Sequence, residues 1–352
     1  MNAGSIWWEQ IGTSLRFVDS IVRHMSDGDP AVIHLRSDIP WRQRFYECID
    51  FRRTSFSGDR RLRRLKWENG MNPGEFVLSH LCSPEVQANY WPGKTYAEYL
   101  AEKDDIPLSD YFVWITDIFE SEDLENWIDF VNQYMKHQDG YSHRAIFVLE
   151  YSGCELESKD IDVVTYSVEK YDCFVFSLES VSSMQNTDLP SYQAELAYGI
   201  VGRDPELCHE LLKTGKKLLQ DPVKTALSVG ESSMTSEGKQ FSKMNEKKVS
   251  SAAWNASVVQ FFPVIERFRM TITERYKKEL KSRLPVKNSN GEYINDPLDL
   301  EIGALYFLLK KHKGLVSYGD WQNVSFCREA RNLLAHNKAI SYDDAKTLLS
   351  LI

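Results

Sequence analysis

Arg331, Asn332 and His336 are the residues whose types and spacing best suit chemistry in this sequence. A histidine suits proton transfer because its ordinary pKa of about 6.5 lies near neutral pH. An arginine suits a phosphate that gains charge during a reaction, because its charge is permanent and its donors form a fork. Asn332 is a polar residue that can form hydrogen bonds beside them. These residue types are therefore suited to proton transfer and to binding an anion.

A helix must carry these residues. The apolar residues Ala330, Leu333 and Leu334 fit a helix that is buried along one side. Asn337 is a good stop residue, and Lys338 complements the negative end of the helix dipole. We therefore expect Arg331 and His336 to lie at the C-terminal end of this helix.

The spacing adds a geometric condition. Residues five apart on an ideal helix point roughly 140° away from each other, so Arg331 and His336 converge poorly on one regular helix. Either the helix ends before His336, or two copies of the chain meet. A structural alternative is that both residues cap carbonyl groups and form ion pairs with Glu329 or Glu301. Arg328 is a second arginine on the same helix, and the sequence does not exclude it as the working one.

The pattern Arg331-Asn332-x3-His336 resembles the signature of the HEPN superfamily, whose members are small helical domains and often metal-independent ribonucleases. The resemblance implies that His336 is the general acid or base, that Arg331 holds the phosphate and that Asn332 orients it. It also implies an RNA substrate, no cofactor, and a homodimer through the C-terminal helical domain, because such sites form at a dimer interface. Many members are non-catalytic, so a scaffold remains an alternative.

The composition favours a globular protein of two domains. The chain has 352 residues, of which 42% are hydrophobic, and about 100–200 residues make a typical domain. No apolar run is long enough for a membrane span, and the N-terminus lacks a secretory signal pattern, so we expect a cytoplasmic protein without membrane contact. The scattered cysteines, without a Cys-x-x-Cys pair, favour a reducing compartment and no zinc site: Cys48, Cys82, Cys154, Cys173, Cys208 and Cys327.

The net charge of the chain bears on whether it binds nucleic acid over a large surface. A net charge of −9 argues against general coating of nucleic acid, which needs a basic surface. One basic segment is an exception, and it is a candidate contact for RNA or another anion through Arg60, Arg61, Arg63 and Arg64. Trp67 beside it is an aromatic side chain that can stack on a base. The alternative is a solvated, mobile surface connection.

Continuous apolar runs separated by helical patterns predict a mainly parallel sheet in the N-terminal half. The expected strands are residues 31–35, 111–116, 145–149, 162–166 and 173–177. The strand–turn–helix start resembles a P-loop-type ATPase domain, but residues 36–41 contain neither glycine nor lysine, so nucleotide hydrolysis is not expected there. Asp117 and Glu150 follow strands and are a possible vestigial nucleotide site. For Asp117, the alternative is a helix cap or a surface carboxylate.

These patterns predict an α/β domain followed by an all-α helical bundle. We expect the α/β domain with a helical extension over residues 1–228, a linker over 229–247 and the HEPN-like domain over 248–352. An amphipathic helix is expected over residues 6–25.

The resemblances together predict a metal-independent endoribonuclease of a bacterial defence or toxin-like system. A catalytically dead NTPase-like domain would regulate it, and a protein partner is expected within a defence complex. The alternative is a non-catalytic scaffold or adaptor that recruits a protein partner through both domains.

Overall fold

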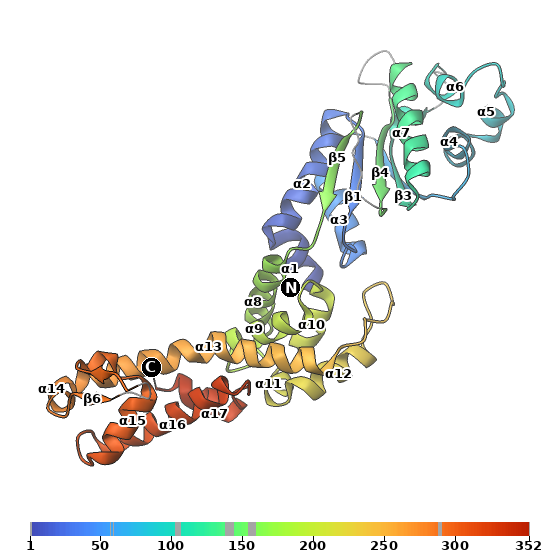
Figure 1. Cartoon of the computed structure of the whole chain (residues 1–352). Coiled ribbons are helices and arrows are strands. Elements are labelled where there is room, and N and C mark those ends of the chain that lie inside the picture. The colour runs from blue at the N-terminus through green and yellow to red at the C-terminus, as the bar shows by residue number, and fades with distance from the viewer. Residues whose placement is uncertain are drawn as a thin grey trace. The chain divides into compact units, whose positions relative to one another are not determined.

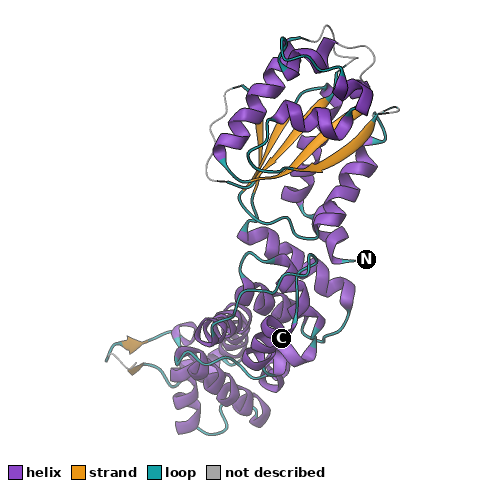
Figure 2. Ribbon diagram, turned by 90° about the vertical axis from the view of Figure 1, so that its right-hand side faces the viewer, coloured by secondary structure: helices purple, strands orange, loops and turns teal. Residues whose placement is uncertain are grey.

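The protein divides into two compact units, Met1–Asp172 and Cys173–Ile352, which are described separately. The structure is a computed structural model, and it describes residues 2–56, 58, 60–102, 107–137, 144–153, 160–287 and 291–351. The first unit contains the sheet, and the second is mostly helical, as Figures 1 and 2 show. The predicted fold class is confirmed.

Five parallel strands form the sheet of the first unit, in the order β2-β3-β4-β1-β5. Every residue of β1 and β4 is buried, as expected for a sheet that is covered on both faces. The strands are β1 (Ala31–Leu35), β2 (Arg61–Lys66), β3 (Tyr111–Ile118), β4 (Ile146–Tyr151) and β5 (Asp162–Tyr166).

Helices lie on both faces of this sheet (Figures 1 and 2). Alternate residues of β3 and β4, among them Ile115 and Leu149, pack into a core with Trp127 and Val131 of α7. On the other face, rings of α1, α2 and α3 pack together with Tyr166 of β5. The helices are α1 (Ala3–Gln10), α2 (Gly12–Asp27), α3 (Arg42–Arg53), α4 (Pro73–Leu81), α5 (Pro84–Ala88), α6 (Tyr96–Glu102) and α7 (Ser121–Lys136), with the 3-10 helix η1 (Pro107–Asp110).

A long helix, α13 (Glu246–Arg275), organises the second unit. It packs against α9 and α12, and also against α16 and α17 (Figure 1). The other elements are α8 (Lys170–Met184), α9 (Pro190–Val201), α10 (Pro205–Lys213), α11 (Lys216–Gln220), α12 (Pro222–Ser232), α14 (Lys277–Lys281), α15 (Ile302–Lys311), α16 (Tyr318–Ala335), α17 (Tyr342–Leu349), the 3-10 helix η3 (Pro297–Asp299) and the short hairpin β6 (Val286–Lys287) and β7 (Tyr293–Ile294).

Several predicted elements differ from the structure. Residues 173–177, expected as a strand, lie inside α8, because a short apolar run does not distinguish a strand from a buried helix. The basic segment 61–66, interpreted as a contact or a mobile connection, is strand β2. The helix expected over residues 6–25 is two helices, because Ile11 has an extended conformation between them.

The compact units also divide earlier than the predicted linker. The break lies at residues 172 and 173, whereas the linker was expected at 229–247. Helix α9, assigned by the prediction to the N-terminal domain, packs along α13 instead. Its buried Tyr192 donates or accepts a hydrogen bond of 2.9 Å with Ser257 of α13, which ties the two helices together.

Within the described ranges, no helix has both the length and the apolar character that crossing a bilayer requires. Five cysteines are free and buried, and Cys154 lies outside the described residues.

Candidate functional site

Helix α16 is held firmly on its buried side. Val324, Cys327, Ala330 and Leu334 face the interior at helical spacing. The indole Nε1 of Trp254 in α13 donates a hydrogen bond of 2.7 Å to the carbonyl oxygen of Leu334. This bond satisfies a carbonyl group in the last turn of α16 and fixes the end of the helix.

The helix ends where the sequence predicts. His336 is its C-terminal cap residue, and Asn337 adopts the left-handed conformation with a φ of 57°. The backbone N–H of Lys338 donates to the carbonyl of Leu333 at 2.9 Å, and that of Asn337 donates to Leu334 at 3.2 Å. This pair of bonds is a Schellman motif, which terminates helices at glycine or asparagine. One of the two conditions on the Arg331–His336 spacing is therefore met.

The side chains at this helix end are open to solvent. Arg331 and Asn332 are half-buried, and His336 is exposed. Within the described part of the chain, none of the three side chains forms a hydrogen bond or an ion pair, and neither Glu329 nor Glu301 pairs with them. The three polar groups are thus available to a ligand.

Arg328 differs from Arg331 in this respect. Its guanidinium lies 4.4 Å from the ring centre of Tyr306 and 5.2 Å from that of Phe307. Tyr306 in turn stacks on Trp321, with ring centres 5.0 Å apart. Arg328 therefore stabilises the contact between α15 and α16 through cation–π attraction. Of the two arginines, Arg331 is the better candidate for binding a phosphate.

Glu150, at the end of β4, is a buried residue with several partners. It is 1% exposed and forms an ion pair with Arg42 of α3. The indole of Trp114 donates to it at 3.1 Å, and the hydroxyl of Tyr46 donates at 3.3 Å. These contacts hold α3 against the sheet and engage both oxygens of the carboxylate.

The pKa values of Tyr46 and Arg42 are shifted by burial and by their contacts with Glu150. Burial, with the negative charge of Glu150 beside the ring, raises the pKa of Tyr46 to about 12. Burial lowers the pKa of Arg42, but the attraction of Glu150 and the hydrogen bonds to Tyr46 and Glu150 outweigh it, so that the pKa of Arg42 lies above its ordinary value. Both side chains stay protonated at neutral pH.

The turn between β1 and α3 is filled by the protein itself. The indole of Trp8 donates to the carbonyl of Pro40 at 2.8 Å, and Ser37 Oγ accepts from the backbone N–H of Val168 at 3.2 Å. A Cβ atom added to Gly4 of α1 would lie 3.0 Å from the Cβ of Trp41, so helix α1 packs directly on the start of α3. A phosphate at this helix start would have to displace these contacts.

Asp117 lies on the strand beside Glu150 but in a different environment. It interrupts the register of β3 against β4, and its φ of 63° is left-handed. Its carboxylate is 3.2 Å from Lys66 Nζ, in a pair whose side chains are 31% and 79% exposed respectively. Exposed pairs of this kind contribute little to stability. Asp117 fits the surface-carboxylate alternative.

The four arginines of the basic segment have different surroundings. Arg64 pairs with Asp50 at 3.1 Å and stacks over the ring of Tyr46 at 4.3 Å, so it stabilises the fold. Arg60 lies 5.7 Å from the ring centre of Phe112, and its burial lowers its pKa. Arg61 and Arg63 are exposed on the edge strand β2, and the guanidinium of Arg63 also lies 5.5 Å from the ring centre of Tyr111. They are the members of this set that remain accessible to an anion.

Trp67 does not serve as a base-stacking platform. It is 3% exposed, and its ring packs edge-on against Phe76 and Trp127 in the core. The sequence-based interpretation of Trp67 is therefore wrong, because an aromatic residue at the end of a strand also suits the core.

One group of metal-binding residue types lies in the first unit. Donor atoms of Glu98, Glu102 and His137 lie within 4.8 Å of one another, and Glu102 already pairs with Lys94. Carboxylates at a surface gather in this way without binding an ion, so we assign no metal here.

No protein-family model matches the chain, and no curated protein matches it significantly. Sequence reasoning missed Arg42 and Trp114, the partners of Glu150, because they lie far from it along the chain. It also missed a cavity beside the start of α16, described below, although its Lys310 and Lys313 form a recognisable basic segment around His312.

Proposed function

We propose that the second unit is a metal-independent endoribonuclease of the HEPN type, with Arg331, Asn332 and His336 as its active residues. The observation that carries the proposal is the end of α16. The helix stops one residue before His336, and the side chains of all three residues have no partner within the described residues. An open arginine and histidine at a fixed helix end suit a phosphodiester substrate.

The proposed reaction needs only proton transfers and charge stabilisation. His336 accepts the proton of a ribose 2′-hydroxyl, and the 2′-oxygen attacks the adjacent phosphorus. The bond from phosphorus to the 5′-oxygen breaks, and that oxygen takes a proton from a histidine, giving a 2′,3′-cyclic phosphate and a 5′-hydroxyl. Arg331 binds the phosphate as its charge grows. A second protomer would supply the second histidine, which is why we also propose a homodimer through the helical unit.

The first unit is proposed as a regulatory, catalytically dead NTPase-like domain. The filled turn before α3 and the buried Glu150 support the absence of nucleotide hydrolysis. A role in bacterial antiviral defence or in a toxin-like system, together with a protein partner, is what the HEPN resemblance implies. Arg61 and Arg63 on β2 are proposed as a secondary RNA contact.

Cleavage of labelled tRNA or total RNA in EDTA tests the proposal. The wild type is expected to cut, whereas His336→Ala should lose roughly 10²–10⁴-fold in rate. Arg331→Lys keeps the charge but removes the fork, and it should fall between the wild type and Arg331→Ala. Lys338→Ala is the matched control, because it removes an exposed charge beside the site and should cut like the wild type. Cutting that persists in His336→Ala contradicts the proposal.

Light scattering at micromolar concentration tests the dimer. The proposal expects twice the chain mass for the wild type. A monomer that still cuts RNA would remove the need for a second histidine, and a monomer that does not cut would favour the second candidate function.

That second candidate is a scaffold that recruits a protein partner. It is favoured by the first unit, where Glu150 is engaged in packing and the turn before α3 is closed. A scaffold predicts no RNA cleavage by wild type or by His336→Ala, together with a stable complex that both proteins form equally well.

A further inference from the structure

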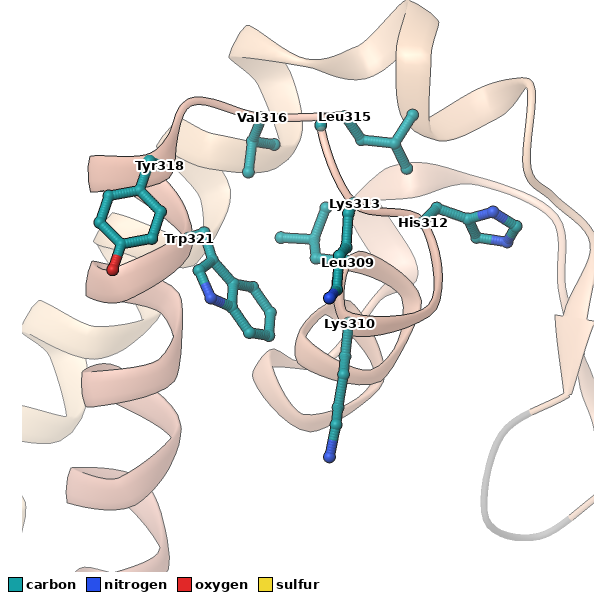
Figure 3. Close-up of a pocket in the computed structure, with 9 residues that line it drawn as sticks. Leu309, Lys310, His312, Lys313, Leu315, Val316, Tyr318 and Trp321 are labelled. Atoms are coloured by element: carbon teal, nitrogen blue, oxygen red, sulfur yellow. The ribbon is translucent and has the colours of Figure 1, made fainter.

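A cavity of about 370 Å³ lies in the second unit, between the end of α15, the segment 312–317 and the first turn of α16 (Figure 3). Its size falls within the range of about 300–1,000 Å³ that small-molecule sites occupy. Residues with apolar, aromatic and basic side chains line it, with one glycine: Leu309, Lys310, His312, Lys313, Gly314, Leu315, Val316, Tyr318 and Trp321.

The lining combines an apolar wall with positive charge. Leu315 and Val316 lie on one side of the cavity, and the indole of Trp321 projects toward it from α16 (Figure 3). The side chains of Lys310, in the last turn of α15, and of Lys313, in the loop after it, run in the same direction, and both are exposed. Neither ammonium group has an ion pair among the described residues, and none of the lining residues is acidic. An anion with a flat apolar group fits this combination.

Trp321 is fixed before any ligand binds. It is half-buried and stacks on Tyr306 with an angle of 19° between the ring planes. Arg328 covers Tyr306 in turn, at 4.4 Å from its ring centre. An aromatic ring that is already ordered loses little conformational entropy on binding, which favours affinity.

The carboxylate of Asp320, the residue before Trp321, does not oppose an anion. It accepts hydrogen bonds from the hydroxyl of Tyr276 at 2.6 Å and from Ser317 Oγ at 2.8 Å, and it pairs with Arg275 at 3.1 Å. Burial raises its pKa, but these contacts outweigh burial and hold the pKa below its ordinary value. The negative charge of Asp320 is therefore balanced locally, and it anchors the start of α16.

We infer that this cavity binds a nucleoside phosphate, with the base against Trp321 and the phosphate between Lys310 and Lys313. Bases stack well on aromatic rings, and a lysine binds phosphate as a point charge. The site is separate from the proposed catalytic residues, because fifteen residues of helix place Trp321 about 22 Å from His336 at 1.5 Å per residue. The inference goes beyond the proposed function and does not depend on cleavage.

The nucleoside phosphate has two possible sources, a free nucleotide or one nucleotide of an RNA strand. Isothermal titration of the full chain with AMP, ATP and inorganic phosphate tests the first. A short 5′-phosphorylated RNA, titrated into His336→Ala so that it stays uncut, tests the second. Saturable binding of a nucleotide supports the site, as does RNA binding that Trp321→Leu weakens, and the comparison identifies the source.

Matched variants test the position of the site. Lys310→Ala combined with Lys313→Ala should weaken binding about tenfold or more. Trp321→Leu should weaken it about tenfold, whereas Trp321→Phe, which keeps a stacking surface, should retain most of it. Lys311→Ala is the control, because Lys311 is an exposed neighbour that does not line the cavity. Circular dichroism of each variant establishes that it is folded.

Three results would overturn the inference. The first is no saturable binding of AMP, ATP or RNA at millimolar concentration. The second is an equal loss in Lys311→Ala and in the double lysine variant. The third is inorganic phosphate binding as tightly as AMP, which would leave no role for the base. Because His336→Ala should bind nucleotides as the wild type does, failure of cleavage and failure of this site are distinguishable.

Discussion

Glu150 and His336 both lie where a secondary-structure element ends, yet their surroundings are opposite. Glu150 is buried and bonded to Arg42, Tyr46 and Trp114, which lie on other elements of its unit. His336 is exposed, and its side chain has no partner within the described residues. A polar residue whose bonds are all made inside the protein holds the fold, whereas one that is held in place but left open can bind a ligand. Glu150 therefore serves the packing of its unit, whereas the side chain of His336 is open to a ligand.

Removing Glu150 should have the largest effect on stability. Glu150→Ala removes the buried carboxylate that pairs with Arg42 and accepts from Trp114 Nε1, and it should lower the free energy of unfolding by about 3–5 kcal/mol. Urea unfolding followed by circular dichroism measures the change. Asp117→Asn is the control, because its exposed pair with Lys66 predicts a change below about 1 kcal/mol. Equal effects of the two substitutions would remove the contrast between a structural and a surface carboxylate.

Loss of the bond from Trp254 should loosen the end of α16. Trp254→Phe removes the donor to the carbonyl of Leu334, and it should lower the free energy of unfolding by about 1–2 kcal/mol. Hydrogen exchange should also become faster at residues 331–336. Trp91→Phe, at an exposed tryptophan, should change neither quantity. Unchanged exchange in Trp254→Phe would mean that packing alone fixes the site.

Asn337 should matter through its backbone conformation. Alanine adopts the left-handed conformation, here with a φ of 57°, less readily than asparagine does. Asn337→Ala should therefore lower the free energy of unfolding by about 1 kcal/mol. Asn337→Gly should be neutral or slightly stabilising, because glycine adopts this conformation freely. Thermal unfolding of the two variants distinguishes them. If both variants destabilise equally, then the side chain of Asn337, rather than its conformation, is needed.

The smallest expected effect is a dependence of stability on acid. Hydrogen bonds from Lys346 and Tyr342 lower the pKa of Asp188 to about 2. A carboxyl group with a lowered pKa stabilises the folded protein at pH values above its ordinary pKa of about 4. This stabilisation is lost as the pH falls toward 2. Comparing unfolding of wild type and Asp188→Asn between pH 5 and pH 2 should show the difference between them shrink. A constant difference would mean that Asp188 does not act through its charge.

The sequence predicted the elements whose signal is local. The apolar runs at 31–35, 111–116, 145–149 and 162–166 correspond to strands β1, β3, β4 and β5, because β-branched and aromatic residues between turn signals favour a strand. The end of α16 was predictable because Asn337 carries the stop signal itself. The strand β2 was not predicted, because its many arginines leave no clear alternation of apolar and polar residues in the sequence.

Other features depended on contacts between distant residues. Residues 173–177 form a helix because Cys173 and Phe176 pack inside a helical unit, which the run alone does not reveal. The role of Glu150 depends on Arg42 and Trp114, at sequence separations of 108 and 36. No local pattern specifies such partners, so the packing role of Glu150 could not be predicted from the residues around it.

The edge strand β2 has a consequence for how copies of the protein meet in concentrated solution. A strand at the border of a sheet has backbone donors and acceptors on its outer side, which can pair with the strand of another copy. The exposed charges of Arg61 and Arg63 repel the same charges on an approaching copy and so oppose aggregation by sheet extension. Whatever these two arginines bind, they also protect the solubility of the folded chain.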